Sequence, residues 1–341
     1  MEFKLITTLE GLQPIAAEWN ALLDVSASHV PFLRYEYLST WWQTLGGGEW
    51  KQAGLAVVTA YQDGRLLGIA PLFAAQNRQD EPALLLLGSI EVSDYLDIIA
   101  RPEDLPAFFA GLLPYLASLE QPRWQVLDWY NLLEGSPSLP ALAQAAAQLG
   151  WSFTQERLQH SPYIALPGDW ETYLAGIDKK QRHEIRRKMR RLEESGLAMR
   201  WYLVEDEATL AGEIEAFMDL MAQDSDKAAF LTPPMRQLFT SVTRCAFQAQ
   251  CLHLAFLEIN GEKAAAYMNF DYLNRLWIYN SGVNHDYMEY SPGWVLLGYL
   301  LRWANEHNIK EFDFMRGDEE YKYRFGAIDR YVVRAVLRRP S

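Results

Sequence analysis

Residues 251–283 read CLHLAFLEINGEKAAAYMNFDYLNRLWIYNSGV, and this stretch decides the fold of the second half of the chain. Runs rich in apolar and aromatic residues are separated by two turn signals, Asn260-Gly261 and the surroundings of Asn274. An Asn-Gly pair between such runs is typical of a tight hairpin turn. The pattern therefore predicts a three-stranded antiparallel meander.

The segments on either side of the meander predict helices and further strands. Residues 291–308, SPGWVLLGYLLRWANEHN, have the apolar spacing of a helix, and residues 309–317, IKEFDFMRG, predict a strand. Upstream, residues 170–194 predict one long helix, followed by a strand at 199–204 and two more helices. VVRAVLRR, residues 332–339, predicts a last strand.

The first half of the chain has a rougher version of the same order. Residues 54–75 predict a hairpin around Asp63-Gly64, and residues 124–132 predict a strand. Helices are expected at 106–119 and from Ser138, as N-cap, to Gly150. The shared order predicts an α/β protein of two similarly built units, with mixed sheets flanked by helices and domains at residues 1–163 and 164–341.

Composition and charge narrow the function classes. The 341 residues carry a formal net charge of −13, which argues against a general DNA or RNA binder. The two cysteines have no CxxC spacing and the six histidines are scattered, so we expect no disulfide framework and no metal site. No long apolar run or basic leader is present, so we expect a cytoplasmic protein without a transmembrane segment, or one peripheral to the inner membrane.

One segment departs from this acidic balance. Residues 179–191 hold eight Lys and Arg and one acid, or +7, which leaves −20 for the remaining chain. Ile185, Met189 and Leu192 recur at helical spacing, so the basic side chains cover the other faces. We expect Arg186, Arg187 and Arg190 to bind phosphate groups; the alternative is a solvated face that balances internal acids.

Three further segments contain candidate site residues. Ser291 and Gly293 precede an apolar helix, whose first N–H groups are suited to an anion, although plain helices also begin this way. Residues 312–326 combine acids, Lys, Arg and aromatics after a strand, which is typical of an active-site loop or of a salt-bridged surface loop. Asp94 and Tyr95, between two apolar runs, could bind an acceptor or could form a turn.

The basic segment KKQRHEIRRKMRRLEESG and residues 281–326 resemble the GNAT-superfamily acyltransferases of the BioF2-like (CelD-type) group, which are related to the Fem peptidyltransferases. PFLRYEYLSTWW and SDYLDII, near the start, are similar to the same group. The resemblance implies two tandem GNAT-like domains. It also implies that Lys322 stabilises the oxyanion of the reaction and that Tyr321 helps to hold it, as part of an aromatic-Lys pair followed by Phe325-Gly326.

The sequence and the resemblance together predict an N-acyltransferase. An acyl group would pass from an activated carrier, with acyl-CoA or acetyl-CoA as co-substrate, to a small-molecule or lipid-linked amine. Asp313 or Glu319 would accept the proton that the amine loses, and Arg316 would help to bind the phosphates of the carrier. Two alternatives remain: a Fem-like transferase that uses aminoacyl-tRNA, and a non-catalytic accessory protein of envelope polysaccharide or lipid assembly.

Overall fold

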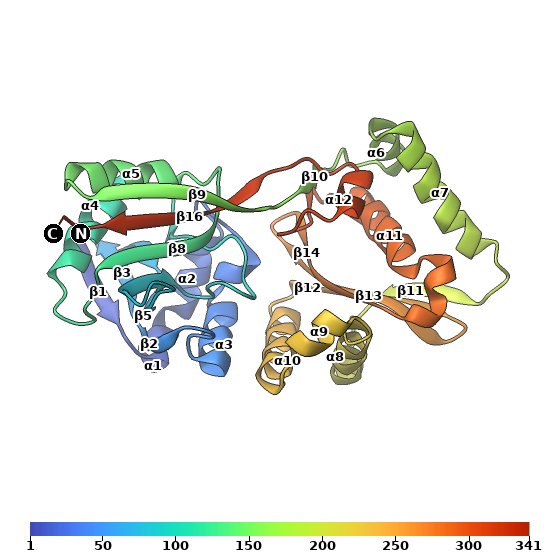
Figure 1. Cartoon of the computed structure of the whole chain (residues 1–341), viewed down its shortest axis with the longest axis horizontal. Coiled ribbons are helices and arrows are strands. Elements are labelled where there is room, and N and C mark those ends of the chain that lie inside the picture. The colour runs from blue at the N-terminus through green and yellow to red at the C-terminus, as the bar shows by residue number, and fades with distance from the viewer. Residues whose placement is uncertain (341) are drawn as a thin grey trace. The chain divides into compact units, whose positions relative to one another are not determined.

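A computed structural model describes residues 1–340 and divides them into two compact units (Figure 1). The first unit contains residues 1–160 and 330–340, and the second contains residues 161–329. Each unit is a mixed, mainly antiparallel β structure with helices packed against it, which confirms the predicted α/β fold class.

The first unit is built around two sheets of order β1-β3-β4-β7 and β2-β5-β6-β8-β16-β9. Its strands are β1 (Glu2–Ile6), β2 (Lys51–Leu55), β3 (Val57–Gln62), β4 (Arg65–Ala70), β5 (Leu72–Gln76), β6 (Pro82–Leu86), β7 (Ile99–Ala100), β8 (Val126–Leu133), β9 (Ser152–His160) and β16 (Tyr331–Arg338). Its helices are α1 (Leu9–Leu12), η1 (Gln13–Ile15), α2 (Ala16–Leu23), η2 (Pro31–Leu33), α3 (Tyr35–Leu45), α4 (Leu105–Ser118) and α5 (Ser138–Gln148).

The second unit has one six-stranded sheet of order β10-β15-β14-β13-β12-β11. Its strands are β10 (Tyr163–Ala165), β11 (Met199–Leu203), β12 (Leu252–Ile259), β13 (Glu262–Tyr272), β14 (Arg275–Val283) and β15 (Glu311–Asp313). Its helices are α6 (Trp170–Gly176), α7 (Lys179–Glu193), α8 (Glu207–Met221), α9 (Ser225–Phe230), α10 (Pro233–Gln248), η3 (His285–Tyr290), α11 (Pro292–Glu306) and α12 (Glu320–Arg324).

Helices cover both faces of this sheet. Figure 1 shows α6, α7 and α11 on one face and α8, α9 and α10 on the other. Helix α11 is apolar around most of its circumference because it is buried between the sheet and α7. Gly298 allows the close approach of α7, since a Cβ at this position would lie 2.9 Å from the sulfur of Met189. Stable burial of α11 in this way fixes the position of its first turn.

The predicted meander is confirmed as β12, β13 and β14, with turns at Asn260-Gly261 and at Leu273-Asn274, where the non-glycine residues have positive φ. The hairpin around Asp63-Gly64 is confirmed as well, although each of its arms is divided into two strands that belong to different sheets.

Four local expectations are corrected. The helix expected at 170–194 is two helices, because the Asp178 side chain accepts the N–H groups of Lys180 and Gln181 and starts a new helix. Ser138 is the first residue of α5 and not its cap; its N–H donates to the hydroxyl of Ser136. The strand expected at 309–317 extends only over Glu311–Asp313.

The fourth correction concerns the division of the chain. β16 pairs on one side with β8 and on the other with β9, so residues 330–340 belong to the first unit and not to a domain at 164–341. In residues 1–340, no helix combines the length and the apolar character needed to cross a bilayer.

Candidate active site

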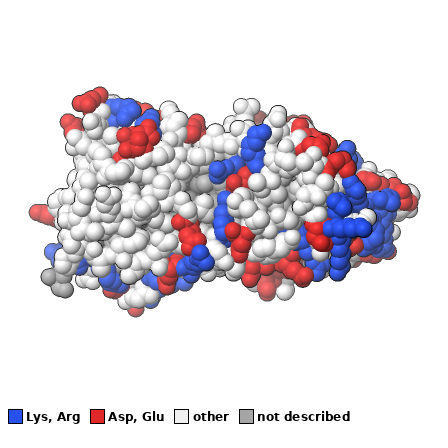
Figure 2. Space-filling view, turned by 90° about the horizontal axis from the view of Figure 1, so that it is seen from above, with Lys and Arg blue, Asp and Glu red and all other residues white. Residues whose placement is uncertain are grey.

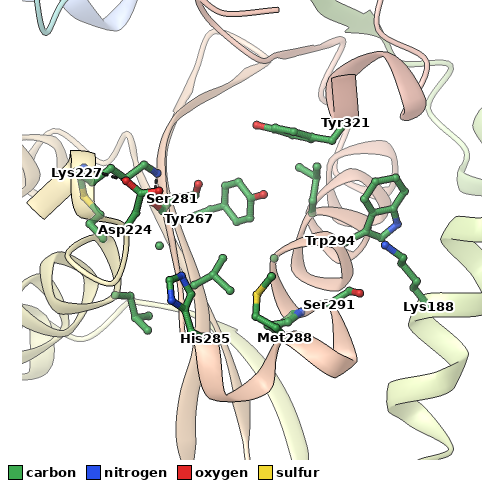
Figure 3. A pocket seen from close by; sticks show the side chains of 17 residues that line it. Lys188, Asp224, Lys227, Tyr267, Ser281, His285, Met288, Ser291, Trp294 and Tyr321 are labelled. Carbon is green, nitrogen blue, oxygen red and sulfur yellow. Dashed lines mark hydrogen bonds between the residues drawn. The ribbon is translucent and has the colours of Figure 1, made fainter. Parts of the chain in front are cut away.

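A pocket of about 450 Å³ lies in the second unit, where β14 and β15 diverge (Figure 3). The parallel pairing of these strands covers only Arg275–Trp277 and Glu311–Asp313, after which β15 ends and β14 continues to Val283. A β-bulge between β13 and β14 lies beside the gap, and bulges redirect side chains next to active sites. The residues that line the pocket belong to α7, α8, α9, α11, α12, η3, β13 and β14 or directly precede one of these helices.

One end of the pocket is suited to an anion. The first turn of α11 begins at Ser291, whose φ of 52° places it in the left-handed region and whose side chain caps no N–H group. The first N–H groups of an α-helix have no partner within the helix, so those of Gly293 and Trp294 are available to a ligand. The indole N–H of Trp294 is also buried without a hydrogen-bond partner in the described part of the chain.

Lys188 adds a positive charge at the same end. Its ammonium lies 4.1 Å from the centre of the Trp294 ring and 3.7 Å from a carboxylate oxygen of Glu184. Burial lowers the pKa of Lys188, and the charge of Glu184 opposes this shift. A bound anion would offset the cost of keeping this partly buried ammonium charged.

Two tyrosine hydroxyls lie in the pocket, Tyr267 from β13 and Tyr321 from α12 (Figure 3). Burial raises the pKa of both phenols, that of Tyr321 well above its usual value, and the neighbouring Tyr267 adds to the shift of Tyr321. Both phenols therefore stay protonated at neutral pH and can donate hydrogen bonds. Neither hydroxyl forms a hydrogen bond with another residue in 1–340.

The opposite flank comes from α8 and α9. At Gly282 a Cβ would lie 2.5 Å from the backbone of Leu220 and Met221, so only glycine allows the end of α8 to pack this closely on β14. The contact brings α9 to the pocket, where the Lys227 ammonium donates to the carbonyl of Ser281. Asp224 and His285 lie nearby in the lining.

Lys322, the predicted oxyanion-binding residue, is not part of this lining. Its side chain is 3% exposed, and its ammonium donates to the carbonyls of Arg316 at 2.9 Å and Gly317 at 3.1 Å and pairs with Glu319 at 2.8 Å. Three acceptors thus occupy its three protons. In this arrangement Lys322 folds the loop at 316–322 and thereby positions the adjacent Tyr321.

The two predicted proton acceptors differ in position. Asp313 is fully buried in β15, accepts the N–H of Met315 at 2.8 Å and lies outside the pocket lining. Glu319 is exposed and also lies outside the lining, but its charge raises the pKa values of both Lys227 and Tyr321. Of the two, only Glu319 lies where it acts electrostatically on pocket residues.

The predicted phosphate-binding residues are only partly brought together. Ser291 and Gly293 line the pocket, but Arg186, Arg187, Arg190 and Arg316 do not. Arg186 pairs with Glu171, and Arg187 forms a bidentate pair with Glu184. The basic residue of α7 in the lining is Lys188, which belongs to the basic segment at 179–191 but was not among the three arginines predicted to bind phosphate.

Helical spacing contained the signal for Lys188. It lies three residues after Ile185 and four before Leu192, both buried, so it borders the core-facing side of α7. Tyr267 and Lys227 had no comparable signal, because strand alternation does not reveal a gap between two strands. Figure 2 shows the Lys and Arg side chains gathered at the end of the second unit that α7 forms.

Asp94 and Tyr95, the predicted acceptor residues, belong to the first unit. Both are buried, Tyr95 has a φ of 54°, and the Arg330 guanidinium lies 5.4 Å from the centre of its ring. Their binding role stays a prediction. In the described residues no group of three or more His, Cys, Asp or Glu side chains is arranged to hold a metal ion.

Comparison with known proteins identifies the class of this second unit. Residues 179–323 match the family model of the acetyltransferase (GNAT) domain, which spans α7 to α12 and therefore includes the pocket. The chain thus carries a GNAT acyltransferase domain, and the assignment to the acyltransferases is confirmed. No curated protein matches the sequence of the chain.

The whole chain is also similar in fold to solved structures. One is the crystal structure of FemX, with a TM-score of 0.67, 11% identity and coverage of 98% of this chain and 97% of that one. Another is L-PGS from Bacillus licheniformis, with a TM-score of 0.56, 13% identity and coverage of 95% and 91%. A conserved protein from Bacteroides thetaiotaomicron VPI-5482 has a TM-score of 0.57, 12% identity and 99% coverage of both chains.

These findings confirm the resemblance to the GNAT superfamily and its Fem-related branch as a statement about fold. Because the similarity to FemX extends over nearly the whole chain, it includes both units. At these identities the solved structures describe architecture and not substrates.

Proposed function

We propose that the protein is an N-acyltransferase that moves an acyl group from acyl-CoA to an amine in the pocket of the second unit. One observation carries the proposal: the gap between β14 and β15 joins an anion-suited helix start to two protonated phenols. The phosphate groups of an acyl-CoA need an anion site, and its thioester carbonyl needs hydrogen-bond donors. The pocket offers both.

The donor end consists of the first turn of α11 and Lys188. Backbone N–H groups and the helix dipole favour phosphate oxygens, and an ammonium strengthens the interaction. Gly293 supports a close fit, since a Cβ there would press on Val283 at 3.0 Å. The acyl chain of the carrier would extend along the apolar part of the lining, which includes Val283 and Leu297.

The reaction joins the amine nitrogen to the carbonyl carbon and breaks the bond from that carbon to sulfur. Negative charge develops first on the carbonyl oxygen and then on the leaving sulfur. Tyr321 is the residue we expect to donate to this charge, with Tyr267 beside it; one well-placed donor contributes about 2.7–4 kcal/mol to such transition states. The amine loses one proton and the sulfur gains one.

Glu319 is the proposed proton acceptor for the attacking amine, acting through water because its carboxylate also pairs with Lys322. Lys322 takes a positioning role in this proposal. Replacing Lys322 with Met should lower turnover and also reduce the thermal stability of the loop, whereas loss of a pure oxyanion donor would leave stability unchanged.

The test is an assay of CoA release from acetyl-CoA and longer acyl-CoAs with a panel of primary amines, combined with mass spectrometry of the product amide. We expect release that depends on the amine, together with saturable binding of acyl-CoA by calorimetry. Absence of both binding and release would overturn the proposal.

One observation favours a second candidate, a Fem-like transfer from aminoacyl-tRNA. On α7, Lys179, Lys180 and Arg190 are exposed and form no ion pair with any residue in 1–340, so the helix that carries the pocket residue Lys188 also presents unpaired basic side chains. Filter binding of tRNA at increasing salt separates the candidates, since a steep loss of affinity indicates phosphate contacts. Replacing the three residues with Gln should then flatten the salt dependence.

A further inference from the structure

The Lys227 ammonium in the wall of the pocket has no counter-ion among the described residues. It comes from α9, on the face of the sheet opposite α7 and α11, and it donates one hydrogen bond, to the carbonyl of Ser281. It forms no ion pair within residues 1–340. Two of its three protons are therefore left for water or a ligand.

The surroundings make this position costly for a charge. Burial lowers the pKa of Lys227, while the more distant charges of Asp224 and Glu319 oppose the shift. One oxygen of Asp224, Oδ1, accepts the N–H groups of Asp226 and Lys227 as the cap of α9, and the carboxylate forms no ion pair with the Lys227 ammonium within residues 1–340. A nearby anion stabilises a partly buried ammonium, and no carboxylate in residues 1–340 forms an ion pair with that of Lys227.

The position is maintained by the fold. The close packing that Gly282 allows holds the end of α8 against β14. Three residues separate α8 from α9, and the last of them, Asp224, caps α9. Lys227 is thus fixed against Ser281, with its ammonium facing the space that Tyr267 and Tyr321 also face (Figure 3).

The pocket consequently has two cationic ends. Lys188 lies with the first turn of α11, and Lys227 lies across the pocket on α9. Under the proposed function the first end binds the phosphates of the donor. The second end is left for the other substrate, whose amine must approach the same two phenols.

We infer that Lys227 binds an anionic group of the acceptor, so that the substrate class is an amine with a carboxylate or a phosphate close to its nitrogen. The inference rests on the proposed function and specifies its acceptor. A simple neutral or polycationic amine lacks the group that would pair with Lys227.

A binding experiment tests the anion site without turnover. The protein is first saturated with CoA to occupy the donor end, and acetate and inorganic phosphate are then titrated in separate series, with thermal stability as the readout. We expect a saturable rise that Lys227→Met weakens at least ~10-fold and Lys227→Arg largely keeps. Lys310→Met, which removes an exposed cation that directly precedes β15 and lies outside the pocket lining, is the matched control and should behave like the natural protein. Equal responses from Lys227→Met and the natural protein would overturn the inference.

A turnover experiment then identifies the anion. Paired acceptors are compared with acetyl-CoA as donor: an amino acid against its amide, and phosphoethanolamine against ethanolamine. We expect the anionic member of one pair to have at least a ~10-fold higher kcat/KM, through KM, and Lys227→Met to abolish the difference. The pair that responds separates a carboxylate from a phosphate. Turnover without any preference for the anionic member contradicts the inference and leaves acyl transfer intact, whereas an anion site without turnover contradicts the proposed function alone.

Discussion

Both units contain two parallel strands joined through a helix, but they differ in what lies beside these strands. In the first unit β6 is joined to β8 through α4, and in the second β14 is joined to β15 through α11. In the second unit β14 continues past the end of β15, and its residues 281–283 line the pocket. In the first unit the chain after β6 packs beside β8, where Asn131 binds it, and its side chains Leu87, Val92 and Leu96 are buried.

Polar contacts hold residues 87–97, the segment that follows β6, in place. Asn131 of β8 donates to the carbonyls of Ile90 at 2.9 Å and Ser93 at 2.8 Å. At the end of the segment Asp97 is buried and accepts the hydroxyls of Ser28 and Ser136, and burial raises its pKa. The difference teaches that the same type of connection can carry a loop that is buried and hydrogen-bonded to the neighbouring strand in one unit, and a strand end that lines a pocket in the other.

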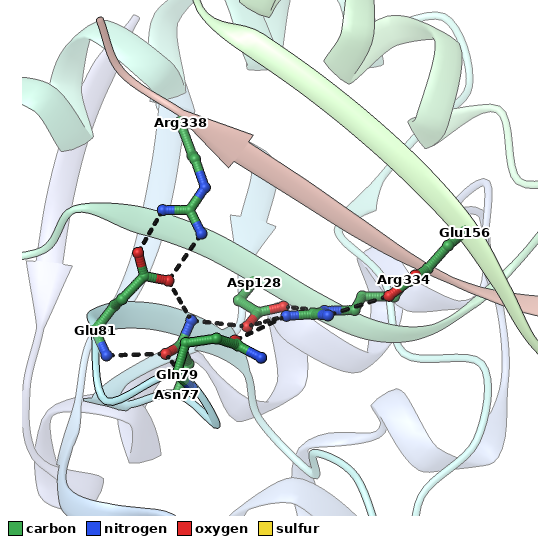
Figure 4. A network of polar contacts seen from close by, with 7 residues as sticks. All are labelled: Asn77, Gln79, Glu81, Asp128, Glu156, Arg334 and Arg338. Carbon is green, nitrogen blue, oxygen red and sulfur yellow. Dashed lines mark hydrogen bonds and ion pairs between the residues drawn. The ribbon is translucent and has the colours of Figure 1, made fainter. Parts of the chain in front are cut away.

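The buried polar centres of the units differ as well. In the first unit Asp128 is fully buried and receives a bidentate pair from Arg334 at 2.7 and 2.9 Å and a hydrogen bond from Asn77 at 3.1 Å (Figure 4). In the second unit His253 is buried, and no charged side chain in residues 1–340 pairs with it. An arginine compensates the buried carboxylate of Asp128, whereas burial keeps the imidazole of His253 neutral at neutral pH.

The largest effect is expected from Arg334→Met. This change leaves the Asp128 carboxylate buried and uncompensated and should lower the free energy of unfolding by about 3–5 kcal/mol. Urea denaturation monitored by tryptophan fluorescence measures the loss. Arg338→Met is the control: its pair with Glu81 at 2.6 Å is more exposed and worth about 0.2–1 kcal/mol. Equal losses of stability in Arg334→Met and Arg338→Met would contradict the importance of pairing the buried Asp128 carboxylate.

The next effect is a pH dependence of stability that originates in His253. Burial lowers the pKa of His253 from 6.5 to about 4. Because the unfolded state binds the proton first, the free energy of unfolding should fall as pH decreases from 6.5 toward 4. The loss is about 3 kcal/mol when complete. The free energy of unfolding, measured by urea denaturation at several pH values in this range, should depend less on pH for His253→Phe. His183→Gln, at an exposed histidine, should show the same pH dependence as the natural protein.

In catalysis, Tyr321→Phe should lower kcat about 100-fold with little change in KM, because the hydroxyl acts on charge that develops in the transition state. Steady-state CoA release measures it. Tyr130→Phe is the control from the first unit. Burial also raises the pKa of Tyr130, to about 12, but Tyr130 lies on β8 with its ring near Arg78 and Arg334. We expect less than about a 2-fold change there. Similar losses in both variants would contradict the assignment of the site to the second unit.

The smallest effect is expected at the donor end. Lys188→Met should raise the KM for acyl-CoA about 10-fold, in line with the loss of one charge-assisted contact. Arg187→Met, one residue away on α7 but directed to Glu184, should change it by less than about 2-fold. If Arg187→Met has the larger effect, the exposed face of α7 binds the carrier, as the sequence analysis expected.

Much of the fold could be predicted because its signals are local. The meander follows from apolar runs and the Asn260-Gly261 turn, and α11 follows from its apolar length and the Pro292 start. The end of one helix and the start of the next at Asp178 were not predicted. Apolar residues recur at helical spacing on both sides of Asp178, so the spacing alone indicates one continuous helix. Of the candidate site residues, Ser291, Gly293 and Tyr321 line the pocket, since they belong to a helix start and a loop next to a strand end.

By itself, the sequence determined the α/β elements, the two-unit order and the position of the basic helix, because periodicity and turn chemistry act between residues close in the chain. Only the tertiary structure decided that β16 completes the first unit, that Lys322 is bound to its own loop, and that Lys188, Lys227 and Tyr267 face one pocket. These facts depend on where two strands separate and on how closely helices approach them, and that is set by packing between segments up to two hundred residues apart in the chain.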